Sequence, residues 1–203
     1  MSEFEHTRDA GFWETIWEDE GGPWDLGGPH PGLRAALDLG LLEDRPRVVV
    51  PGCGGGHDAV LLAEHGHDVV GVDFARHAVE RANALAAARG VTLDVRQADI
   101  FDLEREPAGS FDAAFEYTCF CAIDPAMRDR YAALLTHLIR PGGRLLMMVF
   151  PMERPPGGPP HRVTLDAVRS RFVDGWRWVI DTAPCVSPER RRGNERLAVI
   201  ERT

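Results

Sequence analysis

Apolar runs alternate with amphipathic segments along most of this chain, and the alternation predicts repeated strand–helix units. Five segments rich in β-branched or aromatic residues are predicted strands: 47–51, 68–73, 92–97, 111–115 and 144–150. Apolar residues at helical spacing predict helices that follow Pro31, include Ala59–Ala63, and cover 75–89 and 125–139. Gly90 is expected to end the third of these helices, and Pro141-Gly142-Gly143 the fourth.

The two ends of the chain carry different patterns. A polar, Trp-rich leader with one short helix near 9–19 precedes a loop of glycine and proline at 21–29. Near the other end, Thr164 is expected to cap a helix over 165–172, and 176–183 and 195–202 are expected to pair as antiparallel strands. The whole predicts an α/β fold of one domain over 1–203, with a mostly parallel, doubly wound, seven-stranded sheet and a C-terminal antiparallel hairpin.

Charge narrows the range of partners. The chain has 23 basic residues, all of them arginine, against 32 acidic ones, for a net charge of −9. Nucleic acid and anionic membranes are disfavoured as partners, because neutralising their phosphates needs a basic surface. The polar, acidic start does not resemble a signal peptide, and no apolar run approaches the roughly 20 residues of a membrane span. We expect a cytoplasmic monomer that acts on a small molecule.

The four cysteines are Cys53, Cys119, Cys121 and Cys185, and none forms a Cys-x-x-Cys pair. Cys119 and Cys121 would share one face of an extended segment, yet two further zinc ligands are not near them in sequence. The cysteines are expected to be reduced and buried as small apolar side chains. No metal site is predicted.

The strongest chemical signal is the segment Val48–Asp58, in which a buried strand leads into a glycine-rich turn. Residues without a side chain let the backbone and a helix N-terminus approach a ligand closely. The next strand ends in Asp73, whose carboxylate is placed to accept both hydroxyls of a ribose. These features together predict a nucleoside-binding βαβ unit.

A nicotinamide dinucleotide site is one possible use of such a unit. It requires Gly-x-Gly-x-x-Gly, and the third glycine would fall at His57 here. The spacing of Gly52, Gly54 and Gly56 instead resembles the glycine motif of S-adenosylmethionine-dependent methyltransferases, whose cofactor has no phosphate.

Further segments resemble one methyltransferase family in particular. They are Trp13-x-x-x-Trp17, Pro23-Trp24-Asp25, Val50–Asp58, Ala98–Phe101, Glu116–Ile123, Arg140–Gly143 and Phe150-Pro151. Over nearly the whole chain, from Trp13 to about Arg202, the sequence resembles the thiopurine S-methyltransferase family, and within it most the halide/thiol (thiocyanate) methyltransferase branch. The resemblance implies a Rossmann-like class I methyltransferase fold, S-adenosyl-L-methionine as cofactor and S-adenosyl-L-homocysteine as product.

The resemblance also implies roles for residues at the cofactor. Gly52 would lie against the cofactor, Asp73 would hold the ribose, and Asp99 with Ile100 would meet the adenine. Phe74 is a second candidate for the adenine or a core residue. Most methyltransferases of this fold have an acidic residue where this chain and the family lack one, at Val50. Asp58 is therefore a hypothetical partner of the cofactor's ammonium, with a helix-start carboxylate as the alternative.

The tryptophans form a second group of candidates. Trp13 and Trp17 lie four residues apart on one face of the short helix, and Trp24 follows in the loop. Such a helix often packs its apolar side against a sheet. In the family the leader folds over the cofactor, so residues 1–30 are expected to be a lid. Its rings would attract the sulfonium cation and exclude water.

The acceptor side is less specified. Tyr117 matches a tyrosine at the family's active site, and it could also contact the cofactor or orient a small anion. Phe150 stands where the halide/thiol branch often has a second tyrosine, which puts halide or thiocyanate handling in doubt. His161, in a proline-rich loop, is a candidate base or an exposed histidine. One of Arg190, Arg191 and Arg192 could attract an anionic acceptor.

The sequence therefore predicts an S-adenosylmethionine-dependent methyltransferase that transfers a methyl group in line to a small soft nucleophile. A thiol or thiolate is favoured, with thiopurine, halide and thiocyanate as further acceptors, because a small thiolate needs little help from a base. Two alternatives stay open. One is an O- or N-methyltransferase of a larger metabolite, and the other is a cofactor-binding module without catalytic activity.

Overall fold

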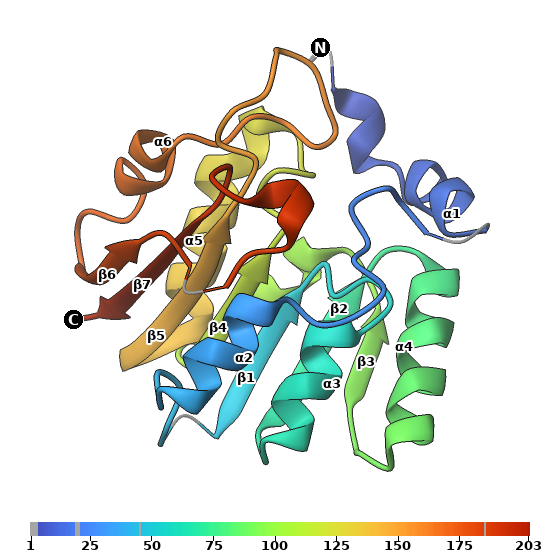
Figure 1. Cartoon of the computed structure of the whole chain (residues 1–203), viewed down its shortest axis with the longest axis horizontal. Helices are drawn as coiled ribbons and strands as arrows, with labels where there is room; N and C mark the ends of the chain where they lie inside the picture. Colours follow the sequence, from blue (N-terminus) through green and yellow to red (C-terminus); the bar gives the residue numbers. More distant parts are fainter. Residues whose placement is uncertain (1–3, 19–20, 45, 185) are drawn as a thin grey trace.

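The computed structural model describes residues 4–18, 21–44, 46–184 and 186–203, and these form layers around one sheet (Figure 1). The strand order is β3-β2-β1-β4-β5-β7-β6. Strand β7 runs antiparallel to both β5 and β6, and the pairs from β3 to β5 are parallel. The strand bounds are β1 Arg47–Pro51, β2 Asp68–Asp73, β3 Asp94–Gln97, β4 Phe111–Tyr117, β5 Ile139–Val149, β6 Trp176–Thr182 and β7 Arg196–Arg202. This confirms the predicted seven-stranded, mostly parallel sheet and its C-terminal antiparallel hairpin.

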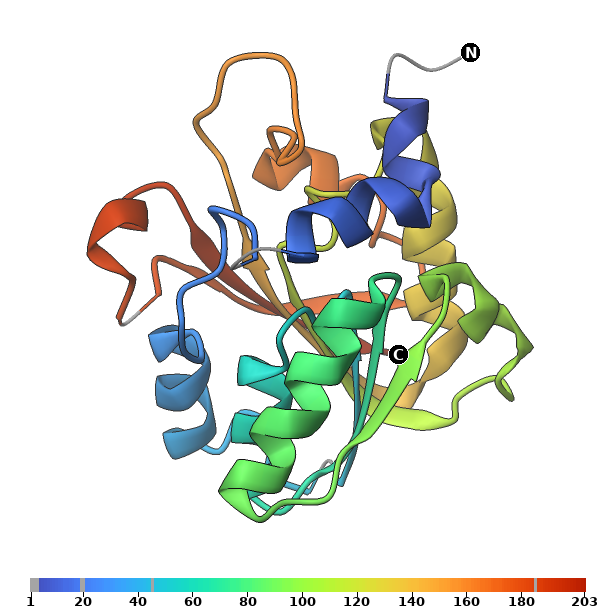
Figure 2. The same cartoon turned by 90° about the vertical axis from the view of Figure 1, so that its right-hand side faces the viewer.

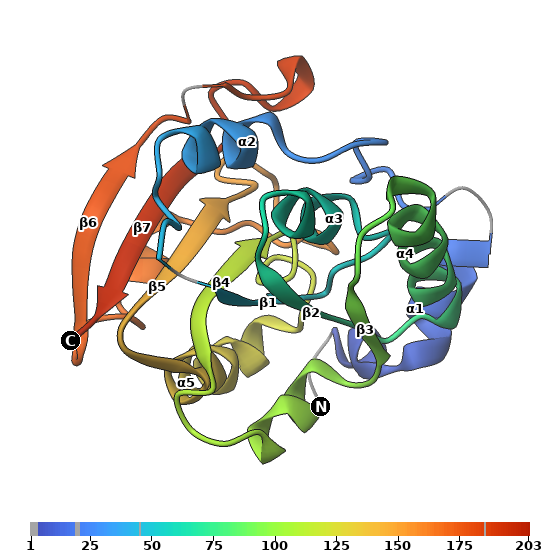
Figure 3. The ribbon, with the colours of Figure 1, turned by 90° about the horizontal axis from the view of Figure 1, so that it is seen from below.

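Helices cover both faces of this sheet. The α-helices are α1 Ala10–Glu18, α2 Pro31–Asp38, α3 His57–Glu64, α4 Arg76–Arg89, α5 Arg128–Leu138 and α6 Leu165–Arg169. Short 3₁₀-helices are η1 Glu5–Arg8, η2 Ile100–Arg105, η3 Pro125–Met127 and η4 Glu189–Arg191. Helices α2, α3 and α4 lie on one face, and α5 lies on the other (Figure 3). Side chains of η2 and α6 pack into the same cluster as α5. Among the residues described, no helix is long and apolar enough to cross a membrane.

The core is divided between these two faces. One cluster joins the α5 side chains to the sheet around Phe111 and Phe172, and the other joins α2 and α3 to Phe115 and Leu146. The β1 strand contributes to both clusters, because successive side chains of a strand point to opposite faces. The near-continuous apolar run of β1 follows from this two-sided burial.

The prediction for the start of β5 was wrong. Helix α5 ends at Leu138, and the buried Ile139 already pairs with Phe111, so Pro141 and the two following glycines lie within the strand. The β4–β5 register shifts at this point, and a Cβ on Gly143 would lie 2.6 Å from the backbone oxygen of Asp112. The glycine therefore permits a bulge in the strand at a close approach between the two backbones. In the sequence, Pro-Gly-Gly can mark either such a bulge or a turn between a helix and a strand, and the pattern does not tell them apart.

Other boundaries differ by a few residues. Strand β3 begins at Asp94, two residues later than predicted, and β4 continues to Tyr117. The predicted helix over 125–139 is divided into η3 and α5, and α6 ends at Arg169. Phe172 is fully buried on the α5 side, so the chain turns inward there. Residue 19, the predicted end of the first helix, lies outside the described residues, and so does Cys185, one of the four cysteines expected to be buried.

Helix α1 lies across the carboxyl ends of the strands, beside the start of α4 (Figure 2). Trp17 of α1 packs with Ala75 and Ala78, and Trp13 adds to this small cluster. The leader thus reaches the edge of the sheet where β1, β2 and β4 end.

Candidate functional site

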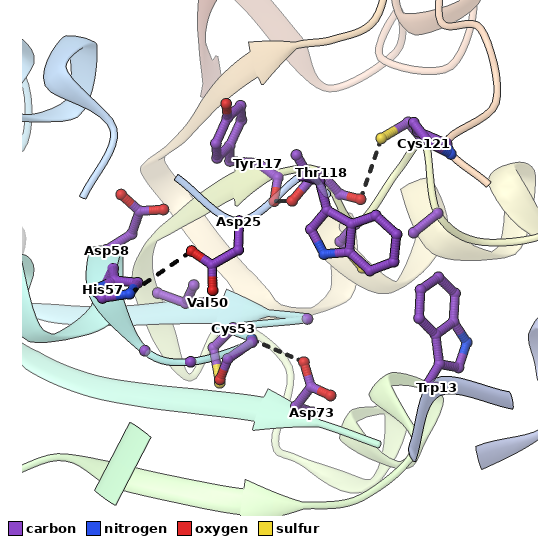
Figure 4. Close-up of a pocket in the computed structure, with 18 of the residues that line it drawn as sticks. Trp13, Asp25, Val50, Cys53, His57, Asp58, Asp73, Tyr117, Thr118 and Cys121 are labelled. Atoms are coloured by element: carbon purple, nitrogen blue, oxygen red, sulfur yellow. Dashed lines mark hydrogen bonds and ion pairs between the residues drawn. The ribbon is translucent and has the colours of Figure 1, made fainter. Parts of the chain in front are cut away.

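A cavity opens at this edge of the sheet, where the strand order reverses between β1 and β4 (Figure 4). Ligands of open α/β sheets bind at such a position. Residues from the leader, the glycine turn and the ends of β2 and β4 line it together. Of the predicted site residues, the cavity brings together Trp13, Trp17, Trp24, Gly52, Asp58, Asp73, Phe74, Ile100 and Tyr117.

The glycine turn forms the floor of the cavity after β1. Gly52, Gly54 and Gly56 all have positive φ, at 60°, 53° and 81°. A Cβ on Gly52 would lie 3.0 Å from the Cys119 sulfur, and a Cβ on Gly56 would lie 2.7 Å from Cβ of Ala82. The glycines are therefore needed both for the backbone conformation and for close packing against neighbouring elements.

Asp73 lies at the end of β2 and is almost fully buried. One carboxylate oxygen accepts from the Gly54 backbone N–H at 2.8 Å, and the other accepts from the Ala75 N–H at 3.0 Å. Burial raises the pKa of this carboxyl, whereas these N–H donors act to lower it. Each oxygen keeps acceptor capacity beyond these bonds, which is what two ribose hydroxyls require.

Asp58, in the first turn of α3, lines the cavity and also has a partner in the protein. Its Oδ1 accepts from the His30 backbone N–H at 2.7 Å, which ties α3 to the start of α2. Burial raises the pKa of Asp58 as well. The predicted contact with a cofactor ammonium stays a prediction. Next to it, His57 Nε2 lies 3.8 Å from Asp25 Oδ1 of the leader loop.

The tryptophans lie over the glycine turn. The Trp17 ring is buried, and a Cβ on Gly54 would lie 2.9 Å from it. The Trp13 ring meets the Trp24 ring edge-on with centroids 5.8 Å apart, and its Nε1 donates to the Thr7 carbonyl at 2.8 Å. These contacts give one end of the cavity an aromatic wall that the leader supplies.

The C-terminal segment fixes the loop that carries Trp24. Arg190 donates to the Asp25 carbonyl at 2.6 Å, and Arg191 donates to the Trp24 carbonyl. Within the arginine run, Arg191 is buried, while its neighbours Arg190 and Arg192 are exposed.

Tyr117 is the last residue of β4, and two buried polar side chains, Arg191 and His30, contact its ring. The Arg191 guanidinium carbon lies 5.1 Å from the centroid of the Tyr117 ring and 4.4 Å from that of Phe150. The His30 ring meets Tyr117 edge-on at 4.6 Å. Neither the Tyr117 hydroxyl nor Arg191 Nη1 has a hydrogen-bond partner among the described residues.

His30 and Glu195 form a buried pair that sequence reasoning missed. His30 Nδ1 accepts from the Gly32 N–H at 3.0 Å, so Nε2 carries the proton and donates to both oxygens of Glu195 at 3.1 Å. The only signal in the sequence is a histidine just before Pro31, where an N-cap is expected. Nothing local links it to a glutamate 165 positions later.

Two predicted site residues do not line the cavity. Asp99 caps η2, where its Oδ1 accepts from the Phe101 N–H at 2.9 Å, although its neighbour Ile100 does reach the cavity. His161 is buried, with its Nδ1 3.1 Å from the Gly157 carbonyl oxygen and its ring 4.3 Å from that of Phe4. Burial lowers the pKa of His161 and favours a neutral ring.

The groups that line the cavity fit a nucleoside that carries a cationic centre. A buried carboxylate with spare lone pairs, a glycine backbone and aromatic faces are present together. No cluster of three or more His, Cys, Asp or Glu side chains suited to a metal occurs in the described part of the chain.

Comparison with known proteins identifies the family of this chain over almost its whole length. Residues 8–199 match the family model of thiopurine S-methyltransferase. Probable thiol methyltransferase 2 of Arabidopsis thaliana is 35% identical over 193 residues, which cover 93% of this chain and 83% of the relative. Thiopurine S-methyltransferase of Pseudomonas fluorescens (strain Pf-5) is 31% identical over 188 residues, which cover 85% of this chain and 84% of the relative.

A solved structure supports the fold. Burkholderia thailandensis 1,6-didemethyltoxoflavin-N1-methyltransferase, with bound 1,6-didemethyltoxoflavin and S-adenosylhomocysteine, superimposes with a TM-score of 0.65 at 22% identity, covering 98% of this chain and 83% of that one. The predicted Rossmann-like class I fold and the predicted cofactor are thereby confirmed. The chain belongs to the thiopurine S-methyltransferase family and is an S-adenosylmethionine-dependent methyltransferase.

Proposed function

We propose that this protein methylates a small, soft, anionic nucleophile, with thiols and thiolates as the first class and thiopurines, thiocyanate and halides as related candidates. The observation that carries the proposal is a pair of buried donors without a partner among the described residues: the hydroxyl of the cavity-lining Tyr117, and Nη1 of Arg191, whose guanidinium lies over the Tyr117 ring. Both atoms are buried, and the Phe150 ring lies beside both side chains, 6.5 Å from the Tyr117 ring centroid and 4.4 Å from the Arg191 guanidinium carbon.

These donors favour an anion over a neutral acceptor. A buried donor without a partner costs about 1–3 kcal/mol, and more when it is charged, so an anion that accepts from both recovers that cost. Burial lowers the pKa of Arg191, and the acidic groups Glu195, Asp58 and Asp25 oppose that effect. These carboxylates therefore favour the charged form of the Arg191 guanidinium.

Neither His161 nor His30 offers a free base to the acceptor, and this favours sulfur over oxygen. His161 was the candidate base, but it does not line the cavity. The His30 ring meets the Tyr117 ring, yet its Nδ1 accepts from the Gly32 N–H and its Nε2 donates to Glu195, so neither nitrogen is free to take a proton. A hydroxyl acceptor must lose its proton to a nearby base, whereas a thiolate or thiocyanate ion reaches the site already ionised.

We further propose the roles of the residues around the cofactor. When bound, S-adenosylmethionine supplies a methyl group on a sulfonium, and the C–S bond to the acceptor forms as the sulfonium C–S bond breaks. Asp73 accepts from the ribose hydroxyls, and Ile100 covers one face of the adenine. The glycine turn lets the backbone approach the amino acid moiety.

The leader is proposed to act as a lid. Trp13, Trp17 and Trp24 close one side of the cavity, exclude water and present aromatic faces to a cation. Arg190 and Arg191 support this position by holding the backbone of Trp24 and Asp25. Tyr117 is proposed to orient the acceptor. Arg191 contacts both parts, because it donates to the Trp24 carbonyl of the lid and lies over the Tyr117 ring.

The names of the relatives support the same class of acceptor, since one is a probable thiol methyltransferase and another a thiopurine S-methyltransferase. The test is incubation with cofactor and a panel of hydrosulfide, thiocyanate, iodide, an aromatic thiol, a thiopurine and a hydroxyl-bearing control, with headspace and mass detection of methylated products. We expect methylated sulfur products. Product only from the hydroxyl compound, or S-adenosylhomocysteine binding without any product, would refute the proposal.

A further inference from the structure

The loop after β4 forms one wall of the cofactor cavity. Its lining residues are Thr118, Cys119, Cys121, Ala122 and Ile123. Thr118 has a φ of 66°, a left-handed conformation that is uncommon for a β-branched residue. A segment in such a conformation persists only where its surroundings hold it.

Glu116 holds this loop from the opposite face of β4. Tyr117 points to the α2–α3 side, so the side chain of Glu116 lies on the α5 side, where it is only 2% exposed. Its Oε1 accepts from the Phe120 backbone N–H at 2.6 Å. A buried carboxylate that accepts from the loop backbone fixes where the loop turns back.

Arg128 of α5 completes the attachment of the same residue. Its Nε donates to the Phe120 carbonyl at 3.1 Å, and its guanidinium carbon lies 4.9 Å from the Phe120 ring centroid. Both backbone groups of Phe120 are therefore bonded to ionisable side chains, the N–H to Glu116 and the carbonyl to Arg128. The position of the cavity wall depends on these two groups.

The other titratable groups that face Glu116 are Cys119 and Cys121 of the loop and Tyr131 of α5, besides the Arg128 cation. Burial raises the pKa of both thiols and of Tyr131, so these three stay neutral at ordinary pH. Burial also raises the pKa of Glu116 to about 7. Glu116 is thus the group in this cluster that changes charge near neutrality.

We propose that Glu116 is a positioning residue that, together with Arg128, holds the 118–123 loop against the cofactor, so that ionisation of Glu116 tightens binding of the S-adenosyl nucleoside. A carboxylate makes a stronger hydrogen bond to an N–H than the neutral acid does. The wall is therefore better held when Glu116 is ionised. The proposal rests on the cofactor cavity and not on the identity of the acceptor.

The test measures S-adenosylhomocysteine binding by calorimetry between pH 5.5 and 8.5, without an acceptor. For the wild type we expect affinity to rise about fivefold with a midpoint near 7, the size of one strengthened hydrogen bond. Glu116→Gln keeps the shape but cannot ionise, so its affinity should not show this midpoint. Glu116→Asp keeps the charge and should retain a midpoint. Glu104→Gln, a partly exposed carboxylate paired with Arg130, is the matched control and should follow the wild type.

Two results would overturn the proposal. One is a wild-type affinity that is constant over this pH range, which needs no variant to be observed. The other is a Glu116→Gln protein whose affinity follows the wild-type curve, because the ionising group would then be elsewhere. Because no acceptor is present, failure of the proposed acceptor class leaves this test unaffected.

Discussion

Replacing Asp73 with asparagine removes a charge from the centre of the cavity while keeping its size. In the wild type, both carboxylate oxygens already accept a backbone N–H, from Gly54 and from Ala75. The asparagine oxygen can keep one of these bonds, but the NH₂ group then lies against the other backbone N–H, and two donors cannot bond to each other. Loss of one charge-assisted bond costs about 1.5–3 kcal/mol, and loss of a ribose hydroxyl bond costs a similar amount in the complex.

Only the second of these losses affects binding directly, so the dissociation constant of S-adenosylhomocysteine should rise roughly 10- to 150-fold. The first should lower the melting temperature of the free protein. Calorimetric titration measures the affinity, and differential scanning fluorimetry measures the melting temperature.

Asp68 offers a matched control at the start of the same strand. Its side chain is 70% exposed and lies 3.6 Å from Arg47, so Asp68→Asn should change stability by less than about 0.5 kcal/mol and leave affinity unchanged. The reasoning is refuted if Asp73→Asn folds and binds S-adenosylhomocysteine within twofold of the wild type. Asp73 would then serve only the turn that it caps.

Three further changes test other parts of the site. Trp17→Ala removes the ring that packs on Gly54, and S-adenosylhomocysteine affinity measured by calorimetry should fall tenfold or more; an unchanged affinity would contradict the lid. Arg191→Met should raise the KM for an anionic acceptor about tenfold in steady-state kinetics, and an equal KM would exclude Arg191 from acceptor binding. Glu116 has its pKa raised from 4.5 to about 7, so the stability it contributes is complete below pH 4.5 and is lost as pH rises through 7. The unfolding free energy of the wild type relative to Glu116→Gln, measured with urea, should therefore fall by about 3 kcal/mol between pH 4.5 and 8, whereas a constant difference would show that Glu116 is not the titrating group.

Several elements of the fold could be predicted because their signal is local. The glycine turn, the strands β1 and β2 and the tryptophan spacing each follow from a short stretch of sequence. The start of β5 could not be predicted this way, since pairing of Ile139 with Phe111 and the bulge at Gly143 depend on a neighbouring strand. Glycine and proline in a sequence indicate which backbone conformations are accessible locally, but not which strand will pair with that segment.

The candidate site shows the same division. The residues that line the cavity from β1, β2 and the leader were identified from motifs, and the structure brings them together. His161 was chosen for its chemistry and Asp99 from the family resemblance, but the hydrogen bonds they make direct His161 to Gly157 and Asp99 to the start of η2. Their position relative to the cavity depends on how loops pack, which residue type does not reveal.

The sequence by itself determined the family, the cofactor and the fold class, because glycine, β-branched and tryptophan positions impose constraints within a few residues of themselves. The tertiary structure decided which charges lie behind the acceptor end. Glu195 is buried against His30, and Arg191 lies over Tyr117, although the partners in each pair are far apart in the sequence. It also placed Glu116 beneath the cavity wall. Burial and distance between remote segments set the energy of a charge, and neither is encoded in any single segment.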